Sequence, residues 1–155
     1  MLKRLLILLW ILLSLPLLAL SAGCMTKEEQ AVRQVVTKYN ENLTLALKRP
    51  QPELMNGLTT PLEGKRITTY LSYFYQQNKV MDSQLKSLEF IKVEIRDQKA
   101  VVRTKEQWSY KHLDLTSRKV VKPEKIINYQ ATYQLEKTNK KWVVASLEVK
   151  DDRKK

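Results

Sequence analysis

The stretch LEFIKVEIRDQKAVVRTKEQWSYKH, residues 88–112, decides the fold of this chain. Apolar and polar side chains alternate on both sides of the polar triplet Asp97-Gln98-Lys99. A period of two is typical of half-buried strands, and a short polar turn joins two such strands into an antiparallel hairpin. The stretch therefore predicts strands at residues 88–96 and 100–112. On the first strand, Ile91, Val93 and Ile95 share one face. On the second strand, one side carries Val102, Thr104, Glu106, Trp108 and Tyr110.

The sequence after this hairpin predicts two more strands, at residues 126–137 and 141–149, joined by the turn Thr138-Asn139-Lys140. Residues 113–124 contain Pro123 and predict a longer loop before the third strand. Strands that follow one another through turns and loops form an antiparallel meander. On the third strand, one face is expected to carry Ile127, Tyr129, Ala131, Tyr133 and Leu135. On the fourth strand, one face is expected to carry Trp142 and Val144, and the other face Val143, Ala145, Leu147 and Val149.

Helical signals precede the strands. Thr26 and Glu29 have the spacing of a capping box, and apolar residues then recur at three and four residues as far as Lys48. A short segment at 53–58 follows, and a second helix is predicted from Pro61 to Asn78, because proline suits the first helical position. Helices followed by a meander predict an α+β fold with N-terminal helices packed on a curved four-stranded antiparallel sheet.

This order of elements resembles the cone-shaped NTF2-like domains. Residues 88–95, 100–104, 129–135 and 141–144 carry a further resemblance to the intermembrane-space domain of plastid and cyanobacterial division proteins. The division proteins have other domains that are absent here, so a division role does not follow. The expected organisation is a leader at 1–23, an NTF2-like domain at 24–150 and a charged tail at 151–155.

The first 23 residues have the parts of an export signal: a basic start with Lys3 and Arg4, then an apolar run at residues 5–20. This run is short for a transmembrane helix, which needs about 20 apolar residues. Residues 20–24, Leu-Ser-Ala-Gly-Cys, resemble the lipobox of bacterial lipoproteins. The resemblance implies cleavage between Gly23 and Cys24 and attachment of diacylglyceryl and palmitate-type acyl chains to Cys24. An uncleaved membrane anchor and plain secretion with an incidental cysteine remain as alternatives.

Composition excludes several site classes. The only cysteine, Cys24, and the only histidine, His112, provide neither an intramolecular disulfide nor a Cys/His zinc site. We therefore expect no metal and no cofactor, and no catalytic residue is assigned. The net charge is +12, and Lys3 and Arg4 are the only charged residues in the leader. An exported protein rarely meets nucleic acid, so the expected counterparts are the membrane that holds the lipid and an envelope protein or anionic surface. A homodimer formed through the sheet is a further possibility.

Two groups of residues are candidates for binding. A possible pocket is lined by Glu106, Trp108, Tyr110 and Tyr133, with a carboxylate that some enzymes of this fold use as a base. The alternatives are that this face turns to solvent or that Glu106 pairs with a lysine. A possible basic loop contains Lys111, Arg118, Lys119, Lys122 and Lys125, and its alternative is a solvated polar loop. Tyrosines 70, 73, 75, 129 and 133 are interpreted as core residues with their hydroxyl groups at the rim.

These observations predict a lipid-anchored cell-envelope protein that faces the periplasm or the exterior. Met25 follows the cysteine where an aspartate would favour the inner membrane, which favours the outer membrane if the host has one. The predicted role is a non-enzymatic interaction or assembly module. The alternative is a small-molecule-binding or catalytic cone that uses the pocket around Glu106.

Overall fold

In the computed structural model, which describes residues 25–152, Thr26 caps the first long helix. Its hydroxyl group accepts a hydrogen bond from the Glu29 backbone nitrogen at 3.0 Å, as the capping-box spacing predicts. The elements in chain order are α2 (Lys27–Lys48), the 3-10 helix η1 (Pro52–Met55), α3 (Pro61–Gln76), β1 (Lys79–Arg96), β2 (Lys99–Asp114), β3 (Val120–Thr138) and β4 (Lys141–Asp151). The predicted leader, its cleavage position, Cys24 and residues 153–155 lie outside the described residues.

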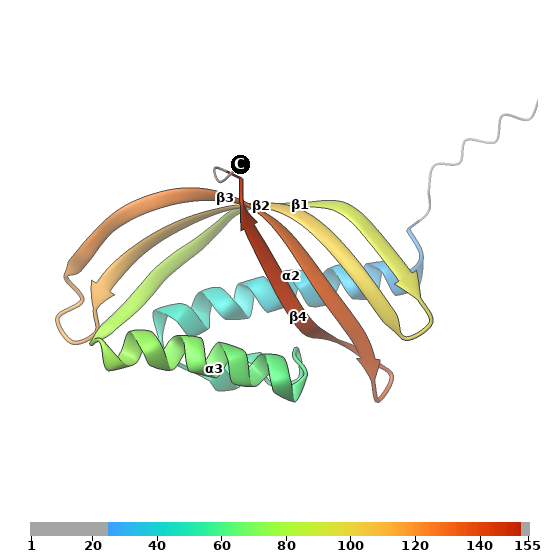
Figure 1. Cartoon of the computed structure of the whole chain (residues 1–155), viewed down its shortest axis with the longest axis horizontal. Coiled ribbons are helices and arrows are strands. Elements are labelled where there is room, and N and C mark those ends of the chain that lie inside the picture. Colours follow the sequence, from blue (N-terminus) through green and yellow to red (C-terminus); the bar gives the residue numbers. More distant parts are fainter. Residues whose placement is uncertain (1–24, 153–155) are drawn as a thin grey trace, which may run out of the picture.

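The four strands form one antiparallel sheet in the order β1-β2-β3-β4. Figure 1 shows that this sheet is strongly curved, with α2 crossing its concave side and α3 beside α2. The predicted α+β fold of helices on a curved four-stranded meander is therefore confirmed. Within residues 25–152, no helix combines the length and hydropathy that a membrane-spanning helix requires.

The core fills the space between the helices and the concave side of the sheet. Val32 and Val36 of α2 are fully buried, because they lie one turn apart on the same face of the helix. The sheet contributes alternate residues of β2 and β3, such as Val102, Ala131 and Tyr133. The inside of the cone is therefore packed with side chains over most of its length.

The structure corrects two predicted boundaries. β1 begins at Lys79 rather than Leu88, because pairing with the end of β2 orders residues whose own pattern does not alternate. The predicted loop at 113–124 is also wrong, since β2 continues to Asp114 and β3 already starts at Val120. The Asp114 carboxylate tightens the short turn by accepting hydrogen bonds from the Ser117 and Thr116 backbone nitrogens.

Two bulges change which side chains face inward. The register of β1 shifts between Phe90 and Lys92, so Phe90 and Val93 pack against the core. Ile91, predicted to share a face with Val93, is instead 48% exposed. A second shift, between Gln134 and Leu135, places Val144 opposite Leu135 and Leu147 opposite Tyr133. Leu147 therefore joins the side of Trp142 and Val144, contrary to the predicted division. An extra residue in one strand reverses the alternation after it.

The structure also corrects the predicted start of the charged tail at residue 151. Asp151 is the last residue of β4 and lies opposite Tyr129 of β3. The Asp152 backbone nitrogen also donates to the Asn128 carbonyl oxygen at 3.1 Å. Pairing with β3 thus extends the ordered sheet one residue beyond the predicted domain end at 150.

Asp82 joins three elements, and its replacement gives a testable effect of pH. Its carboxylate on β1 lies 3.2 Å from the Lys48 ammonium group of α2 and 3.1 Å from that of Lys111 on β2. Burial works to raise its pKa, but the hydrogen bonds from Lys111 and Lys48 outweigh burial and hold the pKa below its ordinary value. We expect Asp82→Asn to lower the free energy of unfolding by about 1 kcal/mol at neutral pH.

The lowered pKa of the Asp82 carboxylate sets the pH at which the difference in stability between wild type and Asp82→Asn disappears. The stabilisation by Asp82 is fully present above the pKa of the unfolded chain and is lost as pH falls through the lower folded pKa. Urea unfolding of both proteins from pH 7 to pH 2 measures the change. A difference between wild type and Asp82→Asn that stays constant across this range would contradict an electrostatic role.

Candidate functional site

Glu106 is the centre of a buried polar network inside the cone. It lies on β2 and is 5% exposed. Its Oε1 accepts hydrogen bonds from the hydroxyl groups of Thr104 and Tyr133, each at 2.7 Å, and its Oε2 accepts one from Trp108 Nε1 at 2.8 Å. Thr104 and Trp108 lie two residues before and after Glu106, so all three side chains share the inner face of the strand. Both carboxylate oxygens are therefore engaged.

The network continues into α2. Asn40 Nδ2 donates to the Tyr133 hydroxyl oxygen at 2.8 Å, and Asn40 is 1% exposed. The ring of Tyr39 meets the ring of Tyr133 edge to face, with centroids 5.8 Å apart, and its hydroxyl group donates to Glu63 of α3. Burial, followed by the nearby Glu106 carboxylate, raises the pKa of Tyr133 well above its usual value, so this phenol keeps its proton. These bonds link the sheet to both helices.

The structure thus brings the four predicted pocket residues together, in two different settings. Glu106, Trp108 and Tyr133 are buried, and the ring of Tyr110 stacks on Trp108 with centroids 5.8 Å apart. Glu106 is not exposed to solvent, and no lysine among residues 25–152 pairs with it, so neither of the two alternatives holds for the described chain. What the first three residues form is a satisfied polar core, whereas Tyr110 faces an opening.

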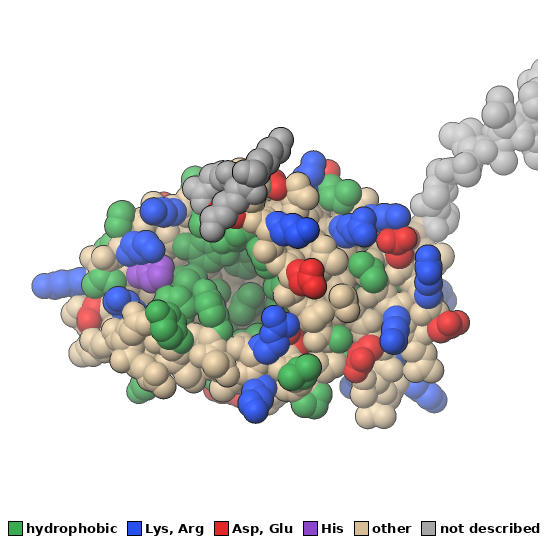
Figure 2. Space-filling view, in the orientation of Figure 1, with side chains coloured by type: hydrophobic (Ala, Val, Ile, Leu, Met, Phe, Trp, Pro, Cys, Tyr) green, Lys and Arg blue, Asp and Glu red, His purple; other side chains and the backbone are tan. Residues whose placement is uncertain are grey.

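That opening is a pocket of about 170 Å³, here called the mouth pocket. Figure 2 shows it as a hollow walled by hydrophobic side chains, with His112 at its edge. Phe74 of α3 packs on His112, with ring centroids 5.4 Å apart. The residues that line the mouth pocket are Tyr70, Met81, Tyr110, His112, Lys122, Pro123, Lys125, Ile127 and Tyr129.

The mouth pocket combines apolar walls with polar groups of distinct character. Burial, followed by the charges of Lys122 and Lys79, lowers the pKa of His112, so its imidazole is neutral at physiological pH. Burial, followed by interaction with Tyr129, raises the pKa of Tyr110, which keeps its hydroxyl proton. With Lys122 and Lys125 at the same opening, the site fits an apolar group that carries a negative charge.

The residues of the predicted basic loop are separated by the fold. Lys122 and Lys125 lie on β3 and line the mouth pocket. Lys111 lies on β2, where it pairs with Asp82, and Arg118 lies in the turn and donates to the Lys48 carbonyl oxygen at 3.4 Å. Lys119 is exposed in the same turn. The prediction of a single basic loop is therefore wrong, because strand pairing points these side chains in different directions.

Sequence reasoning missed part of the mouth pocket. Tyr70, interpreted as a core residue, is 47% exposed and lines the opening together with Tyr129. Met81 lies in the part of β1 that was not predicted. An alternating pattern identifies the inner face of β3. The local sequence does not indicate where the helices stop covering that face. Among residues 25–152, no three His, Cys, Asp or Glu side chains gather as a metal site would need.

Comparison with known proteins identifies the fold. No family model matches the chain, and no curated protein does either. The intermembrane-space region of the chloroplast protein ARC6 superposes with a TM-score of 0.70 at 17% identity, covering 79% of this chain and 96% of that one. An NTF2-like superfamily protein from Salmonella enterica serovar Typhimurium gives 0.54 at 11% identity, over 79% and 92% of the two chains.

A third similar structure is a ketosteroid isomerase-like protein from Erwinia carotovora atroseptica. Its TM-score is 0.51 at 13% identity, and the match covers 82% of this chain and 98% of that one. Similarity at these identities concerns the fold and leaves the activity open. Together with the helices on the concave side of a curved four-stranded meander, these matches show that the chain has the NTF2-like α+β cone fold.

Proposed function

We propose that this chain is a lipid-anchored cell-envelope protein whose NTF2-like domain is a non-enzymatic binding module with the mouth pocket as its contact site. The observation that carries the proposal is the contrast between the two parts of the cone. The inner part is filled, and its carboxylate, Glu106, already accepts three hydrogen bonds. The mouth pocket is the part that stays open, and it combines tyrosine rings with two lysines.

The position of the mouth pocket supports a contact made away from the anchor. The described chain begins at the start of α2, whereas the turn between β2 and β3 lies at the opposite end of the molecule (Figure 1). Arg118 of that turn donates to the Lys48 carbonyl oxygen, at the other end of α2. A helix of 22 residues is about 33 Å long. A lipid on Cys24 would therefore leave the mouth pocket accessible from the aqueous side.

The chemistry of the mouth pocket suggests what it binds. Its volume of about 170 Å³ suits one or two apolar side chains rather than a large cofactor. Lys122 and Lys125 favour a carboxylate beside that apolar group. The proposed partner is an envelope protein with an apolar side chain next to an acidic residue.

Charge reversal at the mouth pocket tests this function. A photo-crosslinking amino acid at Tyr70, which lines the mouth pocket and is 47% exposed, reports the partner as an adduct in the intact envelope. We expect Lys122→Glu with Lys125→Glu to abolish the adduct, because both substitutions repel a partner carboxylate. The matched control is Lys105→Glu with Lys150→Glu, two exposed lysines on either side of Gln130 on the outer face of the sheet. An adduct that survives reversal at 122 and 125 would exclude the mouth pocket as the contact site.

The rival function is a small-molecule-binding or catalytic cone at Glu106. One observation favours it: the predicted pocket residues do meet, and Glu106 is a buried carboxylate beside Tyr133 and Trp108. A substrate would have to displace the hydrogen bonds that occupy this carboxylate. If Glu106→Gln folded normally but lost the partner adduct or a measured ligand, the rival would replace the binding module.

A further inference from the structure

Three segments meet at the end of the molecule where the described chain begins, here called the proximal end. The Glu28 carboxylate of α2 lies 2.7 Å from Lys137 Nζ and accepts a hydrogen bond from Trp142 Nε1, also at 2.7 Å. The Lys137 backbone nitrogen donates to the Gln98 carbonyl oxygen at 2.8 Å. These bonds hold the start of α2, the β1–β2 turn and the β3–β4 turn together.

The proximal end is rich in cations. Lys27 begins α2, and Arg96 and Lys99 flank the first turn. Lys140 lies in the second turn, and Lys141 follows it as the first residue of β4. Lys and Arg side chains surround the start of the described chain in Figure 2, with fewer acidic ones between them. Within residues 25–152, Lys140 and Lys141 have no ion-pair partner, whereas Lys137 is already paired with Glu28. The two lysines at the second turn and the start of β4 are therefore available to an external anion.

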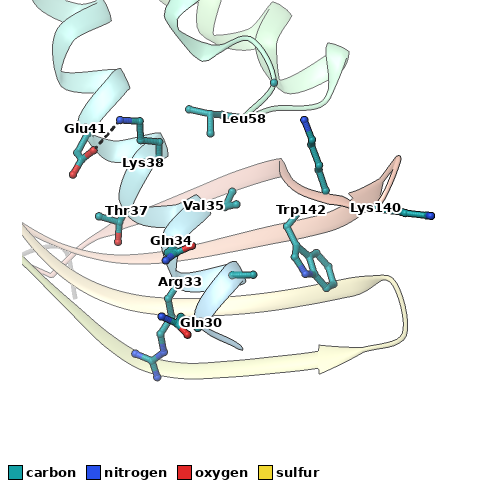
Figure 3. A pocket seen from close by; sticks show the side chains of 13 residues that line it. Gln30, Arg33, Gln34, Val35, Thr37, Lys38, Glu41, Leu58, Lys140 and Trp142 are labelled. Atoms are coloured by element: carbon teal, nitrogen blue, oxygen red, sulfur yellow. Dashed lines mark ion pairs between the residues drawn. The ribbon is translucent and has the colours of Figure 1, made fainter. Parts of the chain in front are cut away.

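A groove of about 740 Å³ opens beside these lysines. Figure 3 shows α2 along one side, Leu58 above and the β3–β4 hairpin with Trp142 and Lys140 opposite. Val35 and Leu58 contribute apolar surface. The charged residues that line the groove are Arg33, Lys38, Lys140 and Lys141 against the single carboxylate of Glu41, which pairs with Lys38 at 3.5 Å.

The short distance from Cys24 to the fold suggests what faces the proximal end. Met25 and Thr26 are the only residues between Cys24 and the first helical residue, Lys27. The three residue steps from Cys24 to Lys27 span at most about 11 Å. If Cys24 carries a lipid, as the proposed function requires, the proximal end lies within about one Debye length of the bilayer surface, where lysines and anionic headgroups attract each other.

We propose that the proximal end docks on anionic phospholipid headgroups of the bilayer that holds the anchor. Lys140 and Lys141 contact the headgroup phosphates, and the groove beside them accommodates the headgroup against Trp142. This contact is a second attachment besides the acyl chains, and it fixes the domain with the mouth pocket turned away from the membrane. In this proposal the expected anionic surface is the bilayer, and it contacts the end of the domain opposite to the β2–β3 turn.

Position-specific quenching tests this inference. The full-length protein is reconstituted in vesicles of phosphatidylcholine with or without phosphatidylglycerol, both containing a headgroup quencher, and a fluorophore is attached to Asn139→Cys or to Ser117→Cys. We expect quenching at Asn139→Cys to be about threefold stronger with phosphatidylglycerol, because lysines near a surface gain from each anionic lipid. Quenching at Ser117→Cys, in the β2–β3 turn, stays low in both.

Charge reversal separates the contact from the anchor. Lys140→Glu with Lys141→Glu is expected to reduce quenching at Asn139→Cys to the level of phosphatidylcholine, while the same change at Arg118 and Lys119 leaves it unaltered. Because Lys140 has a φ of 65°, Lys141→Glu alone is a second variant if the double one unfolds. Equal quenching with and without phosphatidylglycerol, or at Asn139→Cys and Ser117→Cys, would overturn the inference.

Intact mass measured on the same samples distinguishes the two proposals. Strong phosphatidylglycerol-dependent quenching in a chain without acyl mass would support the basic surface and reject the lipid anchor. Acyl mass without such quenching would agree with the lipid anchor and would contradict the docking of the proximal end on anionic headgroups. A salt titration adds a readout that packing changes do not move, since an electrostatic contact weakens as ionic strength rises.

Discussion

Replacement of Glu106 by alanine is expected to lower the free energy of unfolding by about 3–5 kcal/mol. Thr104, Trp108 and Tyr133 donate hydrogen bonds to this carboxylate and are themselves buried. Without it, the Trp108 indole nitrogen, which can only donate, is left with no acceptor. The missing side chain also leaves a cavity at the join between the sheet and α2. Urea unfolding, followed by circular dichroism, measures the loss.

Two variants identify the cause of that loss. Glu106→Gln keeps an acceptor for Trp108, and the Thr104 and Tyr133 hydroxyl groups can reorient to accept from the new amide, so we expect a loss of only about 1–2 kcal/mol. Ser83→Ala removes another buried polar group of the sheet whose Oγ has no hydrogen-bond partner within the described chain. We expect that change to be neutral or slightly stabilising. Equal losses for all three variants would contradict the network.

Replacement of Cys24 by serine is expected to move the protein from the membrane fraction to the aqueous fraction almost completely. A serine hydroxyl does not replace the thiol that the lipobox resemblance marks for acylation. Stable anchoring requires two or more acyl chains, so loss of the attachment point removes the main membrane affinity. The fold should be unchanged, because its core is built from residues 32–144. Fractionation and the intact mass of the membrane-extracted protein check both points.

The mass separates the alternatives that the leader leaves open. A chain that starts at Cys24 with added acyl mass agrees with the lipobox. A chain that retains residues 1–23 in both wild type and Cys24→Ser would mean an uncleaved anchor. A chain without acyl mass in the aqueous fraction would mean plain secretion. In that last case the mouth pocket could still bind a partner, which the crosslink at Tyr70 tests independently.

Much of the fold was predictable because its signals are local. Thr26 and Thr60 each accept a hydrogen bond from the backbone nitrogen three residues later, and these caps start α2 and α3 where the sequence predicts. Alternation along residues 100–108 correctly placed Val102, Thr104, Glu106 and Trp108 on the inner face. Such patterns are short in sequence and depend little on distant residues.

The errors arose where pairing between strands overrides the pattern within one strand. The alternation predicts that Ile91 shares a face with Val93, but a bulge turns Ile91 outward. Pro123 suggested a loop, yet it lies in β3 at a position where the register with β2 shifts between Tyr110 and His112, so no ladder hydrogen bond is required of it. A bulge depends on the length and curvature of the neighbouring strand, which the local sequence does not contain.

The sequence by itself determined the element order, the α+β class and the identity of Glu106 as the carboxylate on the inner face of β2. Only the tertiary structure decided that Trp108 and Tyr133 donate hydrogen bonds to this carboxylate. It also decided that Lys122 and Lys125 line a pocket while Lys111 does not, and that the basic turns beside the start of α2 lie at the opposite end of the molecule from that pocket. The reason is physical: periodicity and capping act over a few residues, whereas burial, cavities and the direction of a charged side chain depend on which distant segments pack together.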